Sequence, residues 1–373
     1  MIYLDYSANT PADQAVLARY CQVVQDYPGN PNSTHPAGKA ALCELERVTD
    51  SIAGLLGVQP SEIIYTSGAS ESNNLAIKGL AHAYRHTGKH IISTALEHSS
   101  VSGSLAALRD AGYEIDLVSV RPDGTADPEH LAELLRPDTV LISLSSVNSE
   151  LGTIQPLAPV SELLRGYPDC RLHLDATQAV GKIPVSFDLA DTVSFAPHKF
   201  YGLNGSGILL KRRTTALTPL IHGGTSTTLY RSGTPDLAMA AACEAALTSA
   251  IRNLDAHNRV VCKWNHLLRE AFRSYPRVRI NSPEQAVPHI LNLSVSGVKG
   301  TVFQRALSER GVCVSVKSAC SADGAPSRAV YAVTGDRKNA LSSFRISLSH
   351  KTTREELDTF LSVFDDCYKE LTK

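Results

Sequence analysis

Two stretches of sequence decide the fold: HLDATQ at residues 173–178 and SFAPHK at residues 194–199. In the first, apolar and polar residues alternate up to Asp175, which predicts a strand with a carboxylate at its carboxyl end. The second begins within a short apolar run and reaches Lys199 directly after it. Ligands of open α/β sheets bind beyond the carboxyl ends of the strands, so we expect Asp175 and Lys199 to face one crevice.

A lysine and an aspartate in one crevice are the side chains that pyridoxal phosphate (PLP) needs from a protein. The lysine can form a Schiff base with the cofactor aldehyde, and the aspartate can keep the pyridine nitrogen protonated. Taken singly, Lys199 as a surface lysine and Asp175 as a helix cap are the simpler interpretations. The other motifs of the chain have to decide between them.

Composition and charge exclude several classes of protein. The 373 residues are enough for a large domain and a smaller one, and the formal net charge of −1 comes without a basic tract. Nucleic acid is therefore not an expected partner. No apolar run approaches the roughly 20 residues of a membrane span, and the first residues lack the features of a signal peptide. We expect a cytoplasmic protein that does not bind membranes.

Strands and helices alternate over the first half of the chain. Expected strands cover residues 63–66, 90–94, 114–120 and 139–147, and expected helices cover residues 99–111, 128–135 and 156–165. This alternation predicts a mostly parallel sheet with helices on both faces. Polar residues collect where the strands end, at Glu97-His98, at Asn148-Ser149-Glu150 and at Asp175, which favours a site at that edge.

The chain is expected to divide into two domains. A long Ala-rich helix is predicted at residues 235–254, and the boundary is placed near its end. Residues 15–255 then form a large α/β domain that binds PLP. Residues 1–14, an N-terminal arm, and residues 256–373 form a smaller α+β domain.

A second candidate site follows the strand that ends at Thr66. The sequence SGASESNN at residues 67–74 leads from this strand into a helix. Small residues at such a turn let backbone N–H groups and the Ser70 hydroxyl converge on an anion, and the helix N-terminus adds about half a positive charge. A phosphate site is one interpretation. An ordinary N-cap at Ser70 is the other, because the Walker pattern is absent from this stretch.

Eight cysteines are present, and none forms a C-x-x-C pair that would indicate a zinc or thioredoxin-type site. We therefore expect no metal site. Most of the cysteines lie in apolar-periodic contexts typical of core or helix positions. Cys320 differs, because small polar residues surround it and Lys317 precedes it by three positions. A nearby positive charge lowers the pKa of a thiol, so Cys320 is the candidate reactive cysteine.

Taken together, these motifs resemble those of the cysteine desulfurases, a family of the class V aminotransferase group with the type I PLP fold. The match spans nearly the whole chain, and the order and spacing of the fragments make it specific. The fragments are YLDYSA at 3–8, GNP at 29–31, TSGASES at 66–72, EH at 97–98, DATQ at 175–178, HK at 198–199, RSGT at 231–234, SAC at 318–320 and FRISL at 344–348. The resemblance implies an α/β large domain with a mostly parallel seven-stranded sheet covered by helices, plus a smaller α+β C-terminal domain.

The resemblance also implies the contacts of the PLP ring. Lys199 is the expected Schiff-base lysine, and Asp175 is the expected partner of the pyridine nitrogen. Gln178 is expected to hydrogen-bond the ring hydroxyl, and His98 to stack on the ring and move protons. Ser149 stands where the family has an asparagine that approaches the ring hydroxyl or the substrate, so it is expected to act through water.

For the phosphate, the resemblance implies the Ala69 N–H, the Ser70 hydroxyl and His198. Thr234 is expected to reach the phosphate of a neighbouring subunit, which implies a homodimer with two composite sites. The sequence departs from the family here, because Ala196 replaces the serine that usually lies two residues before the histidine–lysine pair. One phosphate hydroxyl is therefore missing.

On the substrate side, the resemblance implies a two-bond fork from Arg345 to the carboxylate of L-cysteine, with Asn148 nearby. Cys320 is expected to take the substrate sulfur as a persulfide, which leaves L-alanine, and to pass the sulfur to an acceptor protein. Assembly of iron–sulfur clusters, thiolation of RNA and synthesis of thio-cofactors all stay open as the pathway.

Two alternatives to this function also stay open. A selenocysteine lyase or another class V C–S lyase would share the PLP site and use Cys320 only as an auxiliary residue. A non-catalytic scaffold would keep the fold and bind a partner, although the retained lysine and aspartate argue against it. Single residues keep simpler interpretations as well: a structural role for His198, helix capping for His98 and a surface charge for Arg345.

Overall fold

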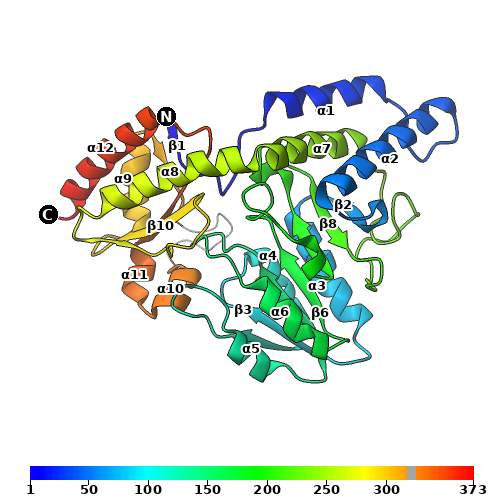
Figure 1. Cartoon of the computed structure of the whole chain (residues 1–373), viewed down its shortest axis with the longest axis horizontal. Helices are drawn as coiled ribbons and strands as arrows, with labels where there is room; N and C mark the ends of the chain where they lie inside the picture. The colour runs from blue at the N-terminus through cyan, green and yellow to red at the C-terminus, as the bar shows by residue number, and fades with distance from the viewer. Residues whose placement is uncertain (317–324) are drawn as a thin grey trace.

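The computed structural model describes residues 1–316 and 325–373, and its largest element is a seven-stranded sheet (Figure 1). In spatial order the strands are β2 (Ile63–Thr66), β8 (Gly207–Lys211), β7 (Thr192–Phe195), β6 (Arg171–Asp175), β5 (Thr139–Ser145), β3 (His90–Thr94) and β4 (Glu114–Val118). β8 is antiparallel to both of its neighbours, and every other pair is parallel. The predicted mostly parallel seven-stranded sheet is confirmed.

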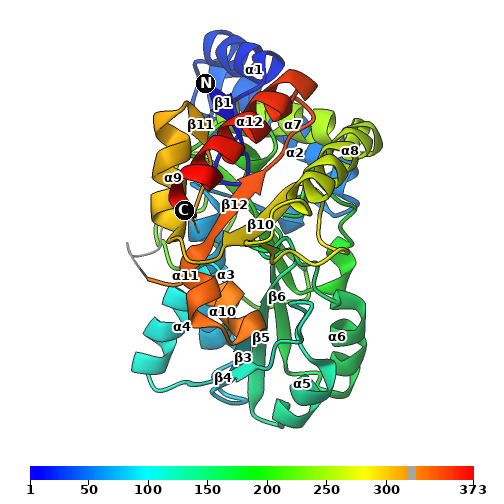
Figure 2. The same cartoon turned by 90° about the vertical axis from the view of Figure 1, so that its left-hand side faces the viewer.

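Helices cover both faces of this sheet because consecutive strand residues point to opposite sides. Ile91 packs with α3 (Ala69–Ala83) and α4 (Ser99–Asp110), whereas Ile92 packs in the cluster on the other face. That second face is covered by α2 (Pro36–Leu56), α5 (Pro128–Leu134), α6 (Leu157–Leu163) and α7 (Leu237–Arg252), with α1 (Gln14–Asp26) against α7. Figure 2 shows α4 and α6 on opposite sides of the strands.

The C-terminal part of the chain forms a second hydrophobic cluster rich in phenylalanine. Its sheet is antiparallel, in the order β12 (Ser343–Ser347), β10 (Ile290–Val295) and β9 (Val278–Ile280). Its helices are α8 (Leu254–Phe272), α9 (Gly300–Glu309), α10 (Arg328–Thr334), α11 (Arg337–Ser342) and α12 (Arg354–Leu371). The N-terminal strand β1 (Ile2–Tyr3) pairs in parallel with β11 (Val312–Cys313), and Leu4 is buried in the same cluster.

The domain division at residue 255 stays a prediction, and we propose it on the basis of these clusters. The buried residues of α7 belong to the cluster of the large sheet, whereas those of α8 belong to the C-terminal cluster. The burial of Leu4 among C-terminal residues agrees with grouping the N-terminal arm with this part. In Figure 1, α7 and α8 run almost end to end between the two parts.

The sequence patterns missed the shortest elements. The strands β1, β9 and β11 were not expected, because two or three residues carry too little periodicity to detect. The short helices α10 and α11 were not expected either. The expected helix at 235–254 ends earlier, at Arg252, and α8 starts at Leu254. Four single turns of 3-10 helix, Pro60–Glu62, Leu164–Gly166, Phe187–Leu189 and Pro197–Lys199, complete the described elements. Among residues 1–316 and 325–373, no helix has both the length and the apolar character of a membrane span.

The topology gathers several strand ends at one edge of the large sheet. β2 and β7 are both antiparallel to β8, so they run in the same direction as β6, β5 and β3. The carboxyl ends of these five strands therefore point to the same side. Arg345, on strand β12 of the C-terminal part, lies on the same side and lines one cavity with residues from these strand ends.

Candidate active site

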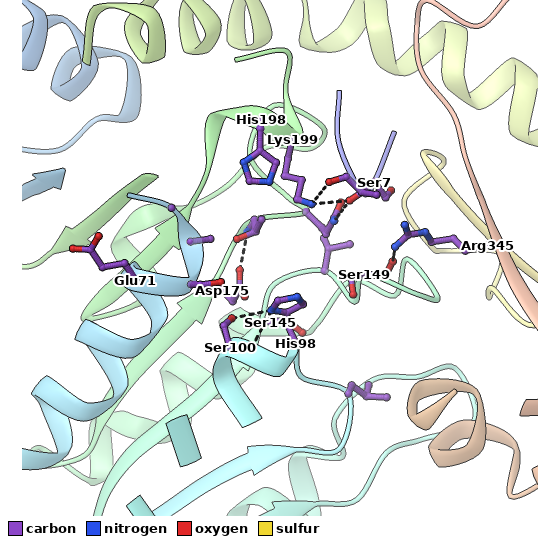
Figure 3. A pocket seen from close by; sticks show the side chains of 18 of the residues that line it. Ser7, Glu71, His98, Ser100, Ser145, Ser149, Asp175, His198, Lys199 and Arg345 are labelled. Atoms are coloured by element: carbon purple, nitrogen blue, oxygen red, sulfur yellow. Dashed lines mark hydrogen bonds between the residues drawn. The ribbon is translucent and has the colours of Figure 1, made fainter. Parts of the chain in front are cut away.

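A cavity of about 390 Å³ lies beyond these strand ends (Figure 3). It is lined by nine of the residues predicted for the site: Ala69, Ser70, His98, Ser149, Asp175, Gln178, His198, Lys199 and Arg345. They come from the segments that follow β2, β3, β5, β6 and β7, and from β12. The edge of the sheet predicted from polar strand ends is therefore the edge at which the cavity lies.

Lys199 ends the single 3-10 turn that follows β7. Its amine donates hydrogen bonds to the carbonyl oxygens of Ser7 (3.0 Å) and Ala8 (2.6 Å), so the N-terminal segment holds it in the cavity. Two residues later, Tyr201 adopts a φ of 69°, which is unusual for a residue with a side chain. Its N–H donates to the Thr10 hydroxyl at 2.7 Å, which fixes the backbone next to the lysine. Such strain is often concentrated at functional sites.

Asp175 is the last residue of β6 and is buried. One carboxylate oxygen, Oδ1, accepts the N–H of Thr177 at 3.0 Å. The other, Oδ2, accepts a hydrogen bond from Asn73 Nδ2 at 2.8 Å. Both donors hold the carboxylate in one orientation at the wall of the cavity. A carboxylate is the group that can keep a pyridine nitrogen protonated.

His98 is both a helix cap and a wall of the cavity, so the two interpretations of this residue are compatible. It is the N-cap of α4, and its Nδ1 accepts the N–H of Ser100 at 3.2 Å. The Ser100 hydroxyl lies 2.8 Å from the same nitrogen. Burial lowers the pKa of His98, while Asp175 raises it and Lys199 lowers it further. The neutral ring with an accepting Nδ1 carries its proton on Nε2.

The start of α3 forms the end of the cavity near β2. The N-cap of this helix is Gly68, without a side-chain hydrogen bond, so the interpretation of Ser70 as an ordinary N-cap is wrong. A Cβ at Gly207 would lie 2.5 Å from the carbonyl carbon of Gly68, which explains why glycine occupies this close approach. Ala69 and Ser70 therefore present the first turn of α3 to the cavity.

Glu71 connects this turn to the loop that contains Thr234. The Glu71 carboxylate accepts hydrogen bonds from the Ser67 N–H at 2.7 Å and from Arg231 Nε at 2.9 Å. Thr234 itself is exposed and does not line the cavity of its own chain. Its predicted contact with a neighbouring subunit stays a prediction.

Gln178 is held by two buried partners. Its Nε2 donates to the Ser7 carbonyl at 2.9 Å, and its Oε1 accepts from the Lys182 amine at 2.5 Å. Burial lowers the pKa of Lys182 well below the ordinary value, and the neighbouring Lys199 and Arg345 lower it further. The Ser7 carbonyl can only accept, so it fixes Nε2 as the donor end of the amide, and one N–H of Gln178 remains for a ring hydroxyl.

Arg345 is 2% exposed, so the interpretation as a surface charge is wrong. Its Nη1 donates to the carbonyl of Ser149 at 2.7 Å, and its Nη2 pairs with Asp5 Oδ1 at 2.9 Å. Ser315 donates to the other Asp5 oxygen at 2.9 Å. The Nε of Arg345 is buried and has no partner among the described residues. Part of the predicted fork is therefore already engaged within the protein.

Asn148 does not line the cavity. Asn148 is buried, and its Oδ1 accepts the N–H groups of Glu150 (3.0 Å) and Leu151 (2.7 Å), while its Nδ2 donates to the Leu96 carbonyl (2.8 Å). These bonds stabilise the turn after β5, which leaves the predicted substrate contact without geometric support. Cys320 lies outside the described residues.

The residues of the cavity fit PLP group by group. An amine for the aldehyde, a carboxylate for the ring nitrogen and the N-terminus of a helix for the phosphate all line one volume. Two further polar atoms of lining residues, Thr177 Oγ1 and His198 Nδ1, are buried and lack partners among the described residues. Burial lowers the pKa of His198 to about 4, so its ring is neutral near pH 7. A polar cofactor would give such atoms partners.

Sequence reasoning gave no role to several residues that shape this site. They are Asp5, Ser7, Ala8, Asn73, Ser100 and Lys182. The first three lie in the YLDYSA fragment, which was noticed only as part of a pattern. A polar residue such as Asn73 on a helix that covers a sheet was the available signal, because buried amides need partners.

Comparison with known proteins agrees with this geometry. The family model Aminotransferase class-V matches residues 2–360. A NifS/IcsS protein homolog of Lactobacillus delbrueckii subsp. bulgaricus is 38% identical, over 100% of this chain and 98% of the relative. Cysteine desulfurase IscS of Dictyoglomus turgidum is 36% identical, over 99% of this chain and 95% of the relative. A solved structure titled NifS-like protein aligns with a TM-score of 0.92 at 32% identity, over 100% of this chain and 99% of the other. The chain therefore belongs to the class-V aminotransferase family and, within it, to the cysteine desulfurases.

Proposed function

We propose that this protein is a PLP-dependent cysteine desulfurase, which converts L-cysteine to L-alanine and transfers the sulfur, as a persulfide on Cys320, to an acceptor protein. One observation carries this proposal. Asp175 and Lys199 follow two adjacent parallel strands, and both line the same cavity as the buried Arg345. This arrangement supports the roles proposed for the three residues, namely ring-nitrogen partner, reactive amine and carboxylate receptor.

Each of these residues has a separate task. The Lys199 amine holds the cofactor and, once released by the substrate amine, takes the proton from the substrate Cα. Asp175 keeps the ring nitrogen protonated, and Arg345 orients the substrate through its carboxylate. The Ala69 N–H and the Ser70 hydroxyl, in the first turn of α3, hold the phosphate together with His198. When bound, PLP supplies a sink for the electrons of the broken Cα–H bond.

Sulfur leaves the substrate by transfer to Cys320. The thiolate of Cys320 attacks the substrate sulfur, so that a sulfur–sulfur bond forms and the Cβ–S bond breaks. The carbon fragment takes up protons and leaves as L-alanine, while the sulfur is oxidised to the sulfane level in the persulfide. The acceptor protein then receives this sulfur.

We also infer a homodimer and a cytoplasmic location. Ile221 and Leu229 are 42% and 70% exposed, and Thr234 follows them on the same loop region. An exposed apolar surface beside a residue expected to serve a second site supports a subunit interface. The seven cysteines of the described part are all free thiols, as is usual in a reducing compartment.

The test is incubation of the purified enzyme with L-cysteine, followed by assays of L-alanine and sulfide and by mass-spectrometric mapping of the persulfide. We expect L-alanine and a persulfide on Cys320. Cys320→Ser should stop sulfur transfer while PLP is retained, because a hydroxyl cannot carry a persulfide. The matched control is Cys262→Ser, which changes an exposed thiol on α8 and should leave turnover unchanged.

Two results would contradict the proposal in different ways. Normal L-alanine and sulfide production by Cys320→Ser would indicate a C–S lyase with an auxiliary cysteine. Turnover of L-selenocysteine with no turnover of L-cysteine would indicate a selenocysteine lyase.

A further inference from the structure

Asn73 is a fully buried amide in the second turn of α3, between the large sheet and α4. It does not line the cavity, yet it contacts residues that do. Burying a polar side chain costs free energy unless each polar atom is hydrogen-bonded. The hydrogen-bond partners of Asn73 therefore indicate its role.

All four hydrogen-bonding positions of this amide are used. Nδ2 donates to Asp175 Oδ2 at 2.8 Å and to the Ser100 hydroxyl at 2.9 Å. Oδ1 accepts from His173 Nε2 at 3.0 Å and from the Ser194 hydroxyl. The reverse orientation of the amide would place its oxygen against the Asp175 carboxylate, so the orientation is determined.

The hydrogen bonds of Asn73 continue through its partners to other side chains of the site. The Ser100 hydroxyl, which accepts from Asn73, lies 2.8 Å from His98 Nδ1 and donates to it. Burial lowers the pKa of His173, and Asn73 Oδ1 can only accept, so the neutral ring donates through Nε2. The Nδ1 of His173 lies 2.9 Å from the Thr192 hydroxyl. A continuous chain of hydrogen bonds therefore joins Asp175 to His98, although the two residues follow different strands.

We propose that Asn73 is a positioning residue of the cofactor site, which orients the Asp175 carboxylate toward the ring nitrogen and, through the Ser100 hydroxyl, reinforces the tautomer of His98 that the Ser100 N–H also favours. The proposal rests on the proposed function in one respect, namely that Asp175 faces the ring nitrogen. Asn73 itself touches neither cofactor nor substrate.

The charged groups around Asn73 determine what a carboxyl group would do in its place. Asp175 and His173 on β6 contact it directly, and His98 at the start of α4 is reached through Ser100. Glu97 interacts electrostatically with Asp175, and burial raises the pKa of Glu97 to about 8, so it is neutral near pH 7. Lys199 acts on His98 from the end of β7.

The decisive variant is Asn73→Asp, which keeps the shape of the side chain and removes its donor. Burial and the Asp175 carboxylate both raise the pKa of the new carboxyl group. Below that pKa the carboxyl proton bridges to Asp175 and restores the hydrogen bond, and above it two carboxylates repel each other. We therefore expect kcat near the wild-type value at low pH and a fall of about 10-fold or more as the pH rises, with KM for L-cysteine changed much less.

The matched control is Asn74→Asp, which adds the same charge to the next residue of α3. The side chain of Asn74 pairs with Lys78 at 2.8 Å and is more exposed than that of Asn73, so this variant should keep the wild-type pH profile. Asn73→Ala should lower kcat at every pH, because no proton can restore the bond. A purely structural role for Asn73 would lower thermal stability without a new pH dependence of kcat.

A second readout is independent of turnover. In holoenzyme reconstituted with PLP labelled with ¹⁵N at the ring nitrogen, Asn73→Ala should shift the nitrogen resonance toward the unprotonated form. Should this variant unfold, Asn73→Asp at high pH gives the same readout. A wild-type resonance in Asn73→Ala, or a wild-type pH profile in Asn73→Asp, would overturn the proposal. The variant Asp175→Asn distinguishes a failure of this inference from a failure of the proposed function. If Asp175→Asn leaves the nitrogen resonance unchanged, the proposed contact between Asp175 and the ring nitrogen is wrong.

Discussion

The two ends of the cavity are built in different ways. The cofactor end, around Asp175 and Lys199, is made from the strand ends of one sheet, from the helices that cover one of its faces and from the carbonyl groups of Ser7 and Ala8. The substrate end, around Arg345, is made from segments that lie far apart in the sequence, namely those of Asp5, Ser149 and Ser315. Behind Asp175, the amide of Asn73 uses every hydrogen-bonding position, whereas Arg345 Nε has no partner among the described residues. The same holds for Thr177 Oγ1 and His198 Nδ1 in the wall of the cavity.

The difference follows from what each end has to bind. A closed network holds its groups in one orientation, which suits a cofactor that stays bound. A buried donor without a partner costs free energy until a ligand satisfies it. Arg345 therefore gains most from an incoming carboxylate, which fits a substrate that enters and leaves in every turnover.

The largest effect is expected at the cofactor end. Lys199→Ala removes the amine that holds the cofactor and moves the substrate proton, so turnover of L-cysteine should fall below detection. Absorbance of the bound cofactor near the visible edge should change, while the far-ultraviolet circular dichroism stays that of a folded protein. The control is Lys39→Ala, on the exposed side of α2. Wild-type turnover by Lys199→Ala would contradict the assignment of Lys199 to the cofactor, and with it the distinction between a cofactor end and a substrate end.

At the substrate end we expect a smaller and more selective effect. Arg345→Lys keeps the charge and loses the planar fork, so about 1.5–3 kcal/mol of binding free energy is lost. KM for L-cysteine should rise about 10- to 100-fold, with a smaller change in kcat, in steady-state kinetics. Arg354→Lys changes an exposed ion pair with Asp358 on α12 and serves as the control. An unchanged KM would show that another group receives the carboxylate.

The smallest effect is expected for His289, a buried residue behind the N-terminal segment, and concerns the stability of the fold in acid. His289 lies there beside Ser7 and Lys182 around a small second cavity, and burial lowers its pKa to about 3. Its neutral form is favoured in the folded state, so its contribution to stability is complete above pH 6.5, the ordinary histidine pKa, and is lost as the pH falls from there toward the folded pKa.

Urea unfolding at several pH values measures this contribution. His289→Gln should reduce the pH dependence of the unfolding free energy by about 1.4 kcal/mol per pH unit between pH 4 and 6. His222→Gln changes an exposed histidine and should retain the wild-type slope. An identical slope in His289→Gln and wild type would contradict the burial argument.

Much of the fold could be read from the sequence because periodicity and strand-end polarity act locally. The strand that ends at Asp175 and the turn that ends at Lys199 both carried their signal within six residues. The role of Asp5 could not be read in this way, because its partner is Arg345, 340 positions away. Asn73 was missed for a related reason: the partners that use its amide come from three other segments of the chain.

The same limit explains why a surface charge stayed open as the alternative for Arg345 and why the predicted contact of Asn148 has no support. Local sequence does not reveal that β12 is covered on both sides, so a surface charge stayed a reasonable interpretation of Arg345. For Asn148, the polar cluster after β5 was read as a site, whereas its first residue stabilises the turn that presents Ser149 to the cavity. Polarity at a strand end indicates the site but does not separate residues that bind from residues that hold the loop.

The contacts of the N-terminal segment have a consequence for synthesis of the protein. Ser7 donates its N–H to the Ser347 hydroxyl at 2.9 Å, and Asp5 pairs with Arg345, so these contacts close across 340 residues. At roughly 5–20 residues per second, a ribosome needs on the order of 17–70 s to make the chain between them. The large sheet can form only in the later part of that interval, once its last strand, which ends at Lys211, has been made. A nascent chain is therefore expected to bring Asp175 and Lys199 together before the N-terminal segment is fixed and before Arg345 can hold a substrate carboxylate.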